Sequence, residues 1–175
     1  MSTTPRVASA IPGEPPSLRS ALAHCPELAM AFHRLYGTMW SEGIVDQATK
    51  ETARMRNARV TDCGFCKKVR FDGAREAGLT EGMVAMIDDD YESSELSDDQ
   101  KLILRFSDAY LRDASNPSPE VVAQMSARYT PAEIVEIAFA LTMFLGMAKV
   151  LISLGTEPEQ MDVMVVPTPA LVGSR

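Results

Sequence analysis

Two cysteines separated by two residues, Cys63 and Cys66, are the side chains of this sequence whose types and spacing best suit chemistry. Thr61 or Asp62 before them is a good N-cap, which predicts that the pair lies in the first turn of a helix. Residues three apart lie on one face of a helix, and two cysteines placed in this way are close enough to form a disulfide. The segment therefore predicts a redox-active pair.

Two physical effects favour the reactive thiolate form of such a pair. Unpaired backbone amides at a helix N-terminus stabilise an anion. Lys67 lies four residues after Cys63 and Arg70 lies four residues after Cys66, so each thiol is expected to have a cation on its own helix face. We therefore expect the pKa of the Cys66 thiol to lie below the ordinary value of about 8.5.

Zinc binding is the competing chemistry for a cysteine pair, and it requires four ligands. His24 and Cys25 are the best candidates for the remaining two, and the sequence has no second pair of cysteines with the same spacing. Redox chemistry is therefore the stronger interpretation, and we expect neither a metal nor a bound cofactor.

Glu51 is a further candidate, because it lies twelve residues before Cys63 in the helix that leads to the cysteines. A tight turn between that helix and an antiparallel successor would bring its carboxylate toward the pair. The spacing alone favours a simpler interpretation, in which Glu51 is an exposed helical residue that pairs with Arg54, three residues further on. Both interpretations stay open at this point.

Proline and capping residues divide the chain into elements. Four of the eleven prolines precede residue 17, so residues 1–20 are predicted to form a flexible arm, followed by a helical domain at 21–156 and a tail at 157–175 that wraps or trails. Helices are predicted from Pro26 to Gly43, from Asp46 to Val60, from Cys63 to Gly78, after Thr80, after Ser97, after Ser118, and from Thr130 to Gly155. No segment alternates clearly enough to predict a strand.

Length and charge limit the possible classes of protein. A chain of 175 residues suffices for one domain with a substantial core. The formal net charge of −7 argues against a nucleic-acid-binding protein, which needs a basic face. The N-terminus lacks the apolar stretch of a signal peptide, so the expected location is cytoplasmic.

The segment from Ile137 to Leu154 is nearly all apolar, yet it carries Lys149. It is shorter than the roughly 20 apolar residues that span a membrane. We therefore expect no membrane span but a buried helix, or one shared with a second subunit, with the segment from Met143 to Met147 as the best candidate for that contact.

The spacing of Glu51, eleven further residues and then Cys63-x-x-Cys66 resembles the alkylhydroperoxidase D-like (AhpD-like) branch of the carboxymuconolactone decarboxylase family. This spacing is the specific part of the resemblance, which covers about residues 26 to 155. The weaker similarities are the phrases Pro26-Glu27-Leu28, Trp40 before Gly43, Ala77-Gly78-Leu79-Thr80 and Tyr129-Thr130-Pro131-Ala132-Glu133-Ile134.

The resemblance implies an all-α fold, a compact multi-helix orthogonal bundle that assembles into trimers or hexamers. It also implies a thiol-dependent peroxidase or a dithiol–disulfide oxidoreductase, acting on a peroxide or a disulfide. Cys66 would be the peroxidatic cysteine, Cys63 its resolving partner, and Glu51 a member of a proton relay. An external dithiol protein, such as one with a lipoyl group, would reduce the disulfide.

One position departs from the family pattern, which has a histidine four residues after the second cysteine, where this sequence has Arg70. Arginine stays charged and cannot pass a proton, but it can stabilise the Cys66 thiolate, orient a peroxide or carboxylate, or pair with Glu51. The departure gives more weight to disulfide exchange. His33 is a hypothetical replacement for the missing histidine.

Two other functions remain open. In a decarboxylase-like lyase, Arg70 would bind a small carboxylated substrate and Glu51 would act as acid or base. In a non-catalytic oligomeric module, the cysteine pair would only respond to the redox state.

Overall fold

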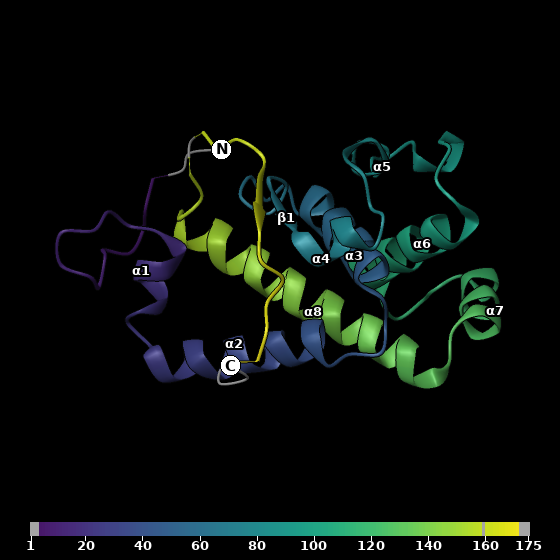
Figure 1. The fold of residues 1–175 in the computed structure, drawn as a ribbon, viewed down its shortest axis with the longest axis horizontal. Helices are drawn as coiled ribbons and strands as arrows, with labels where there is room; N and C mark the ends of the chain where they lie inside the picture. Colours follow the sequence, from purple (N-terminus) through teal and green to yellow (C-terminus); the bar gives the residue numbers. More distant parts are fainter. Residues whose placement is uncertain (1–3, 159, 172–175) are drawn as a thin grey trace.

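The computed structural model describes residues 4–158 and 160–171, whose helices pack around one long helix (Figure 1). The helices are α1 (Leu18–Leu22), α2 (Pro26–Ser41), α3 (Gln47–Val60), α4 (Asp72–Glu76), α5 (Glu81–Ala85), α6 (Asp98–Asp113), α7 (Pro119–Arg128) and α8 (Pro131–Leu154). Two three-residue strands, β1 (Val69–Phe71) and β2 (Met164–Val166), and a single-turn 3-10 helix at Tyr91–Ser93 complete the described elements. The predicted all-α class is confirmed.

Most helices begin and end where the predicted capping residues lie. At the predicted helix starts, a side chain accepts a backbone N–H three residues further on, and these side chains are those of Asp46, Thr80, Ser97, Ser118 and Thr130. Pro26 occupies the first turn of α2, and Gly155 ends α8 in the left-handed conformation with a φ of 63°. These helix boundaries therefore follow from interactions between residues close in the chain.

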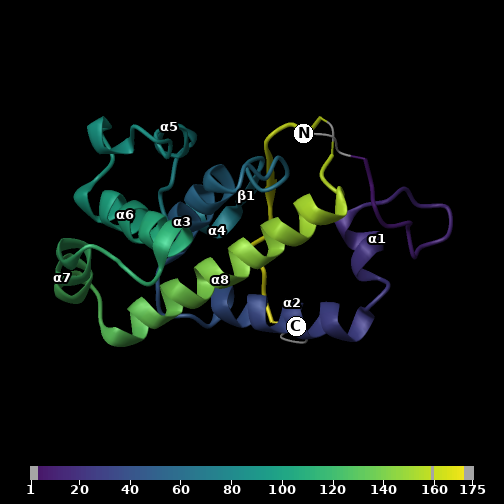
Figure 2. The same cartoon turned by 180° about the vertical axis from the view of Figure 1, so that it is seen from behind.

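Helix α8 is the centre of the fold. It packs against α3 and α6 on one side and α2 on another, and the two opposite views agree on this arrangement (Figures 1 and 2). Its inward side chains, among them Ile137, Leu141 and Phe144, are almost fully buried in the main core. By length and composition alone, α8 is also a described helix that could cross a membrane.

The prediction of a single helix over residues 63–78 is wrong. Helix α3 ends at Val60, because Asp62 adopts the left-handed conformation with a φ of 53°, which interrupts the helical backbone. Residues 61–68 form turns, and β1 and the short α4 follow. Thr61 therefore ends one helix instead of beginning the next.

The expectation of a chain without strands is also wrong, because part of the tail pairs with β1. Strands β1 and β2 are parallel, with Val69 opposite Met164 and Phe71 opposite Val166. Beyond β2, the Thr168 amide and hydroxyl both donate to the Asp72 carboxylate over 2.7 Å. Residues 160–171 thus form a strap that crosses α8 and runs toward α2 (Figure 1).

The N-terminal arm contacts the C-terminal end of α8. The Arg6 amide donates to the Leu154 carbonyl over 2.9 Å, and its guanidinium donates to the Ser153 carbonyl over 2.6 Å. The division at residues 20 and 157 stays a prediction. Residues 1–3, 159 and 172–175 of the predicted arm and tail lie outside the described residues.

Candidate active site

The two cysteines form a disulfide in the turn between α3 and β1. Their Cα atoms are 5.2 Å apart, and the Cys66 amide donates to the Cys63 sulfur over 3.2 Å. The Lys67 amide donates to the Cys63 carbonyl over 3.0 Å, so a single isolated turn holds the pair. Cys63 is fully buried, whereas Cys66 is half-buried. The two sulfurs therefore differ in the access that they give to a ligand.

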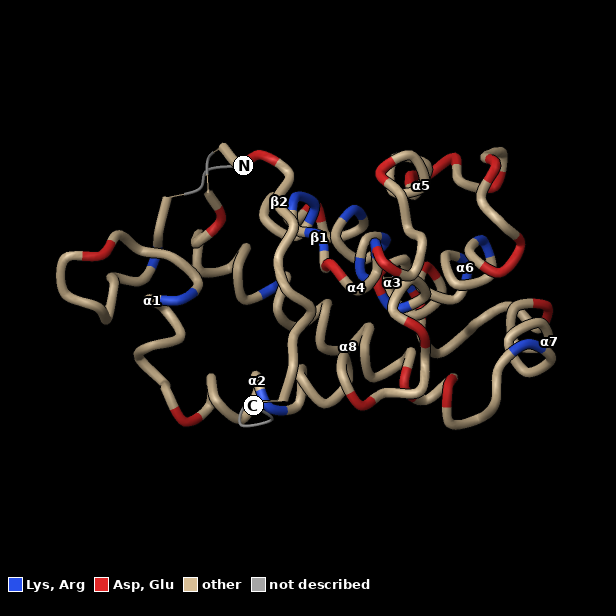
Figure 3. The backbone as a smooth tube through the Cα atoms, in the orientation of Figure 1, with Lys and Arg blue, Asp and Glu red and all other residues tan. Residues whose placement is uncertain are grey.

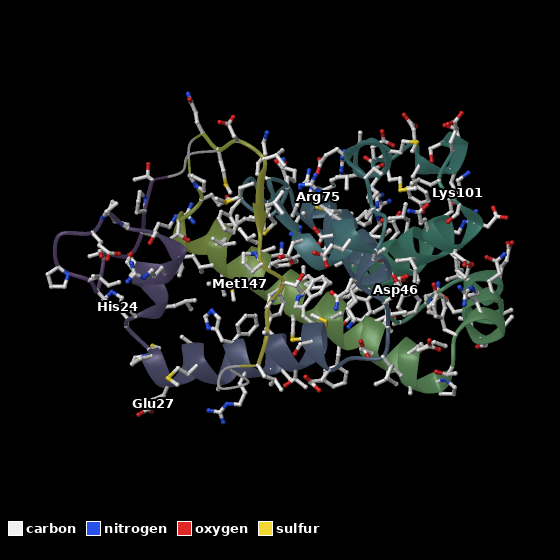
Figure 4. The ribbon with its side chains drawn as sticks, in the orientation of Figure 1. His24, Glu27, Asp46, Arg75, Lys101 and Met147 are labelled. Carbon is white, nitrogen blue, oxygen red and sulfur yellow. A yellow bond between two sulfur atoms is a disulfide. The ribbon has the colours of Figure 1, made fainter. Side chains whose placement is uncertain are left out.

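Cys66 borders a cavity of about 270 Å³, which we call the inner chamber. Its defining residues are Tyr36, Arg54, Asn57, Cys66, Phe144, Met147 and Met164. Met147 lies on α8, where Figure 4 labels it, and Met164 belongs to the strap. Because aromatic and aliphatic side chains form most of its wall, the few polar groups in it are candidates for chemistry.

Arg54 is the cation of the inner chamber, and Glu51 holds it in place. The guanidinium donates to both Glu51 carboxylate oxygens, over 2.7 and 2.6 Å, and to the carbonyls of Cys66 and Val69, over 3.1 and 2.5 Å. Glu51 is 1% exposed and Arg54 is 5% exposed. The predicted pairing is thus confirmed, but the prediction that Glu51 is exposed is wrong.

Burial and pairing act in opposite directions on Arg54. Burial by itself would lower the pKa of the guanidinium, but the charge and the hydrogen bonds of Glu51 raise that pKa above its ordinary value. Arg54 therefore stays charged beside the redox turn.

The two cations expected to share a helix face with the thiols are oriented otherwise, because residues 61–68 are not helical. Arg70 donates to the Glu81 carboxylate over 3.0 Å and to the carbonyl of Lys67 over 2.8 Å. Lys67 pairs with Asp62. The helix-face placement is therefore wrong, and Glu51 pairs with Arg54 instead of Arg70. The catalytic role assigned to Arg70 stays a prediction.

Three polar residues of the inner chamber, Arg54, Asn57 and Tyr36, were not among the predicted site residues, whereas His33 was named as a hypothetical replacement for the family histidine. Asn57 is 1% exposed, and its side-chain oxygen has no hydrogen-bond partner among the described residues. Burial raises the pKa of Tyr36 to about 12, although Arg54 acts to lower it, so the phenol remains a proton donor. His33 also lines the chamber, with its Nδ1 2.7 Å from the Ala29 carbonyl.

A signal for one of these residues was present in the sequence. Asn57 follows Arg54 by three residues, a spacing that places both on one helix face. Tyr36 and His33 lie on α2, and no local pattern relates that helix to the cysteines.

Comparison with known proteins finds sequence relatives for part of the chain. No family model matches the chain. Two curated proteins from strains of Mycobacterium tuberculosis, both named as uncharacterized, are 31% identical over 114 residues, which is 65% of this chain. The chain spans 39% of the length of these relatives.

Two solved structures have similar folds. One is a protein of unknown function from Agrobacterium tumefaciens, described as a candidate antioxidant defence protein AhpD, with a TM-score of 0.68, 19% identity and coverage of 80% of this chain and 97% of that one. The fold is AhpD-like. The other is an uncharacterized peroxidase-related protein from a Silicibacter species, with a TM-score of 0.69, 17% identity and coverage of 85% and 78%.

Within this AhpD-like fold, the inner chamber determines what the cysteine pair can do. Reduction of the disulfide would leave a thiol at Cys66 that a small ligand can reach, with Arg54 hydrogen-bonded to the same residue's carbonyl. Cys63 would remain buried one turn away, ready to close the disulfide again. The arrangement suits a thiol that reacts with a ligand and is then resolved by its neighbour.

Proposed function

We propose that this protein is a thiol-dependent oxidoreductase that reduces peroxides through the Cys63–Cys66 pair. The observation that carries the proposal is the asymmetry of the disulfide, in which the half-buried Cys66 borders the inner chamber and Cys63 is sealed in the core. A peroxide in the chamber reaches Cys66 alone. The AhpD-like fold adds support, because one of its solved examples is named as peroxidase-related.

In the proposed cycle, the Cys66 thiolate attacks the terminal oxygen of a hydroperoxide. A sulfur–oxygen bond forms as the oxygen–oxygen bond breaks, and the departing alkoxide takes up a proton to become an alcohol. Cys66 is then a sulfenic acid. The Cys63 thiol condenses with it, which forms the disulfide and releases water. An external dithiol, for example a dihydrolipoyl group, reduces the disulfide and is itself oxidised.

Arg54 is the proposed stabiliser of the Cys66 thiolate. A guanidinium close to a thiol favours its ionised form. Glu51 is a positioning residue in this proposal, because its carboxylate takes two of the guanidinium hydrogen bonds. The unpartnered side-chain oxygen of Asn57, in the same chamber, accepts the hydroxyl hydrogen of the hydroperoxide.

The Glu51→Gln variant separates positioning from a proton relay. Without the negative charge, Arg54 is less neutralised, so we expect the pKa of the Cys66 thiol to fall by about 0.5 unit. Alkylation of the reduced protein against pH measures that pKa. A large loss of peroxide turnover in a variant with this lowered pKa would assign Glu51 to the relay instead.

His33 has a separate test, since it lines the chamber from α2. If it supplies the proton that the missing family histidine would supply, the His33→Ala variant changes the pH dependence of the rate. An unchanged profile removes His33 from the mechanism.

No observation favours the lyase alternative, since Arg70, its carboxylate-binding residue, is paired with Glu81. Assembly into trimers or hexamers stays a proposal. Large apolar side chains are exposed on α2 and α8, among them Leu35, Val135 and Phe139, and they are the proposed contact between copies.

The deciding experiment measures peroxide consumption with a dihydrolipoyl reductant. We expect Cys66→Ser to be inactive and Cys63→Ser to react once, leaving a sulfenic acid that mass spectrometry detects as one added oxygen atom. Cys25→Ser, which removes the free exposed cysteine, is the matched control and should match the wild type. Equal turnover in Cys66→Ser would overturn the proposal.

A further inference from the structure

A second and larger cavity, of about 720 Å³, lies behind the inner chamber. We call it the outer chamber. It is formed by the N-terminal arm, α1, the first turns of α2 and the end of α8, and its defining residues are Pro5, Ala23, Ala29, Met30, Gly155 and Pro158. Figure 1 shows these segments together at one end of the molecule. The proposed chemistry at Cys66 does not use this space.

The two chambers share part of their walls. The residues that line both are Leu18, Leu22, His33, Phe65 and Leu151. Phe65 lies between the two cysteines in the sequence, so the redox turn itself borders both spaces. Leu18 and Leu22 place α1 over the boundary. The chambers are therefore neighbouring compartments of one apolar region.

Polar groups are distributed unequally between the chambers. Arg54 and Asn57 lie in the inner chamber, beside Cys66. In the outer chamber, the two charged side chains already have partners, since Arg19 pairs with Glu14 and the Glu157 carboxylate accepts the Gly64 amide over 2.5 Å. A ligand that fills both spaces would thus place a polar reactive group in the inner chamber and a long apolar segment in the outer chamber.

We propose, on the basis of the peroxidase function above, that the outer chamber binds the hydrocarbon chain of a long-chain fatty-acyl hydroperoxide. The peroxide group, which lies part-way along the acyl chain, reaches Cys66 in the inner chamber, and the chain segment on one side of it passes beside Phe65 into the outer chamber. The reaction is unchanged, and the product alcohol keeps the chain. Burial of each methylene strengthens binding by about fourfold, so chain length sets the preference among substrates.

The first test compares kcat/KM for hydrogen peroxide, tert-butyl hydroperoxide and linoleic acid hydroperoxide. The long-chain compound should exceed tert-butyl hydroperoxide by at least about a hundredfold. Ala29→Trp, which fills the outer chamber from α2, should lower the ratio of long-chain to hydrogen peroxide activity by about tenfold or more. Ala31 lies on the same helix at an exposed position outside both chambers. The Ala31→Trp variant is therefore the control, and its ratio of long-chain to hydrogen peroxide activity should match that of the wild type. Equal ratios in Ala29→Trp and the wild type would overturn the inference.

The second test measures binding without turnover, by titration calorimetry with the hydroxy derivative of linoleic acid. Free acid and methyl ester are titrated separately, since the chain could come from a free fatty acid or from an esterified lipid. Binding should weaken at least about tenfold in Ala29→Trp, and Ala23→Trp provides a second block if that variant misfolds. Binding without any peroxide turnover would refute the peroxidase function and leave the chamber assignment standing. Turnover without chain-length preference or binding would refute the chamber alone.

Discussion

Arg54 and Arg56 lie two residues apart on α3, and both are buried beneath an aromatic ring. Arg54 stacks on Phe71 at 5.1 Å from the ring centroid, and Arg56 stacks on Tyr91 at 5.2 Å. Their carboxylate partners differ. Arg54 pairs within its own helix, whereas Arg56 donates to Asp108 of α6 over 2.7 Å and to Asp89 over 2.8 Å.

This difference separates the arginine that we propose acts at the redox turn from one that joins parts of the fold. The local pair with Glu51 leaves the Arg54 guanidinium free to donate to the Cys66 carbonyl of the redox turn. Arg56 instead joins α3 to the acidic region between α5 and α6, where red segments gather in Figure 3. The solvent around the partners differs as well, since Asp89 is largely exposed while Glu51 is sealed.

The largest expected effect is on stability. Arg54→Met leaves the Glu51 carboxylate buried and uncompensated, so the free energy of unfolding should fall by about 3–5 kcal/mol. Arg56→Met should cost less, about 1–3 kcal/mol, because water can solvate Asp89, and Asp108 keeps the Tyr91 hydroxyl and Arg112 as partners. Urea unfolding of the oxidised protein measures both. The double variant Glu51→Leu and Arg54→Met should regain most of the loss, and equal losses in the two single variants would contradict the comparison.

The next effect is on the thiol. Replacing the whole pair with Glu51→Gln and Arg54→Gln keeps the net charge and removes the guanidinium, so the pKa of the Cys66 thiol should rise by about one unit. Alkylation near neutral pH should slow by up to about tenfold. Arg56→Gln is the control, and a similar slowing in that variant would show that the charge of α3 matters and not the position of Arg54.

A smaller effect is expected on the attachment of the strap to Asp72. The hydroxyl and amide of Thr168 lower the pKa of the Asp72 carboxyl. The unfolded pKa is the higher one, so the contribution of this contact is complete above about pH 4 and is lost as the pH falls through the folded value. The protection of the amides at residues 163–168, measured as their hydrogen-exchange rate relative to the intrinsic rate at each pH, should therefore fall in acid. In Asp72→Asn the exchange should be fast already at neutral pH, and an unchanged profile would contradict this role.

The smallest effect is expected at Arg70. Because its guanidinium is bound to Glu81, Arg70→His should change peroxide turnover by less than about twofold, as for a substitution outside the chamber. Steady-state rates with the dihydrolipoyl reductant measure this. A large gain in turnover would show that a histidine at position 70 can reach Cys66 and that its absence limits the rate of the wild type.

Much of the helical framework follows from local signals. The capping residues Ser97 and Thr130, the Pro26 start and the Gly155 stop act on neighbours within four residues, so they can be read without the fold. The structure of the segment after Val60 could not be predicted from local signals. Thr61 suits either end of a helix, and the parallel strands join residues more than ninety positions apart.

The order of residues along the chain by itself determined the cysteine pair, the Glu51–Arg54 contact and most helix boundaries, since each depends on spacings of one helical turn. Tertiary structure alone decided that Arg54, and not Arg70, binds the Cys66 carbonyl, that Cys63 is sealed, and that α1, α2 and the strap line two chambers around the redox turn. The physical reason is that burial and cavity shape arise where distant segments meet, and no local pattern carries that information.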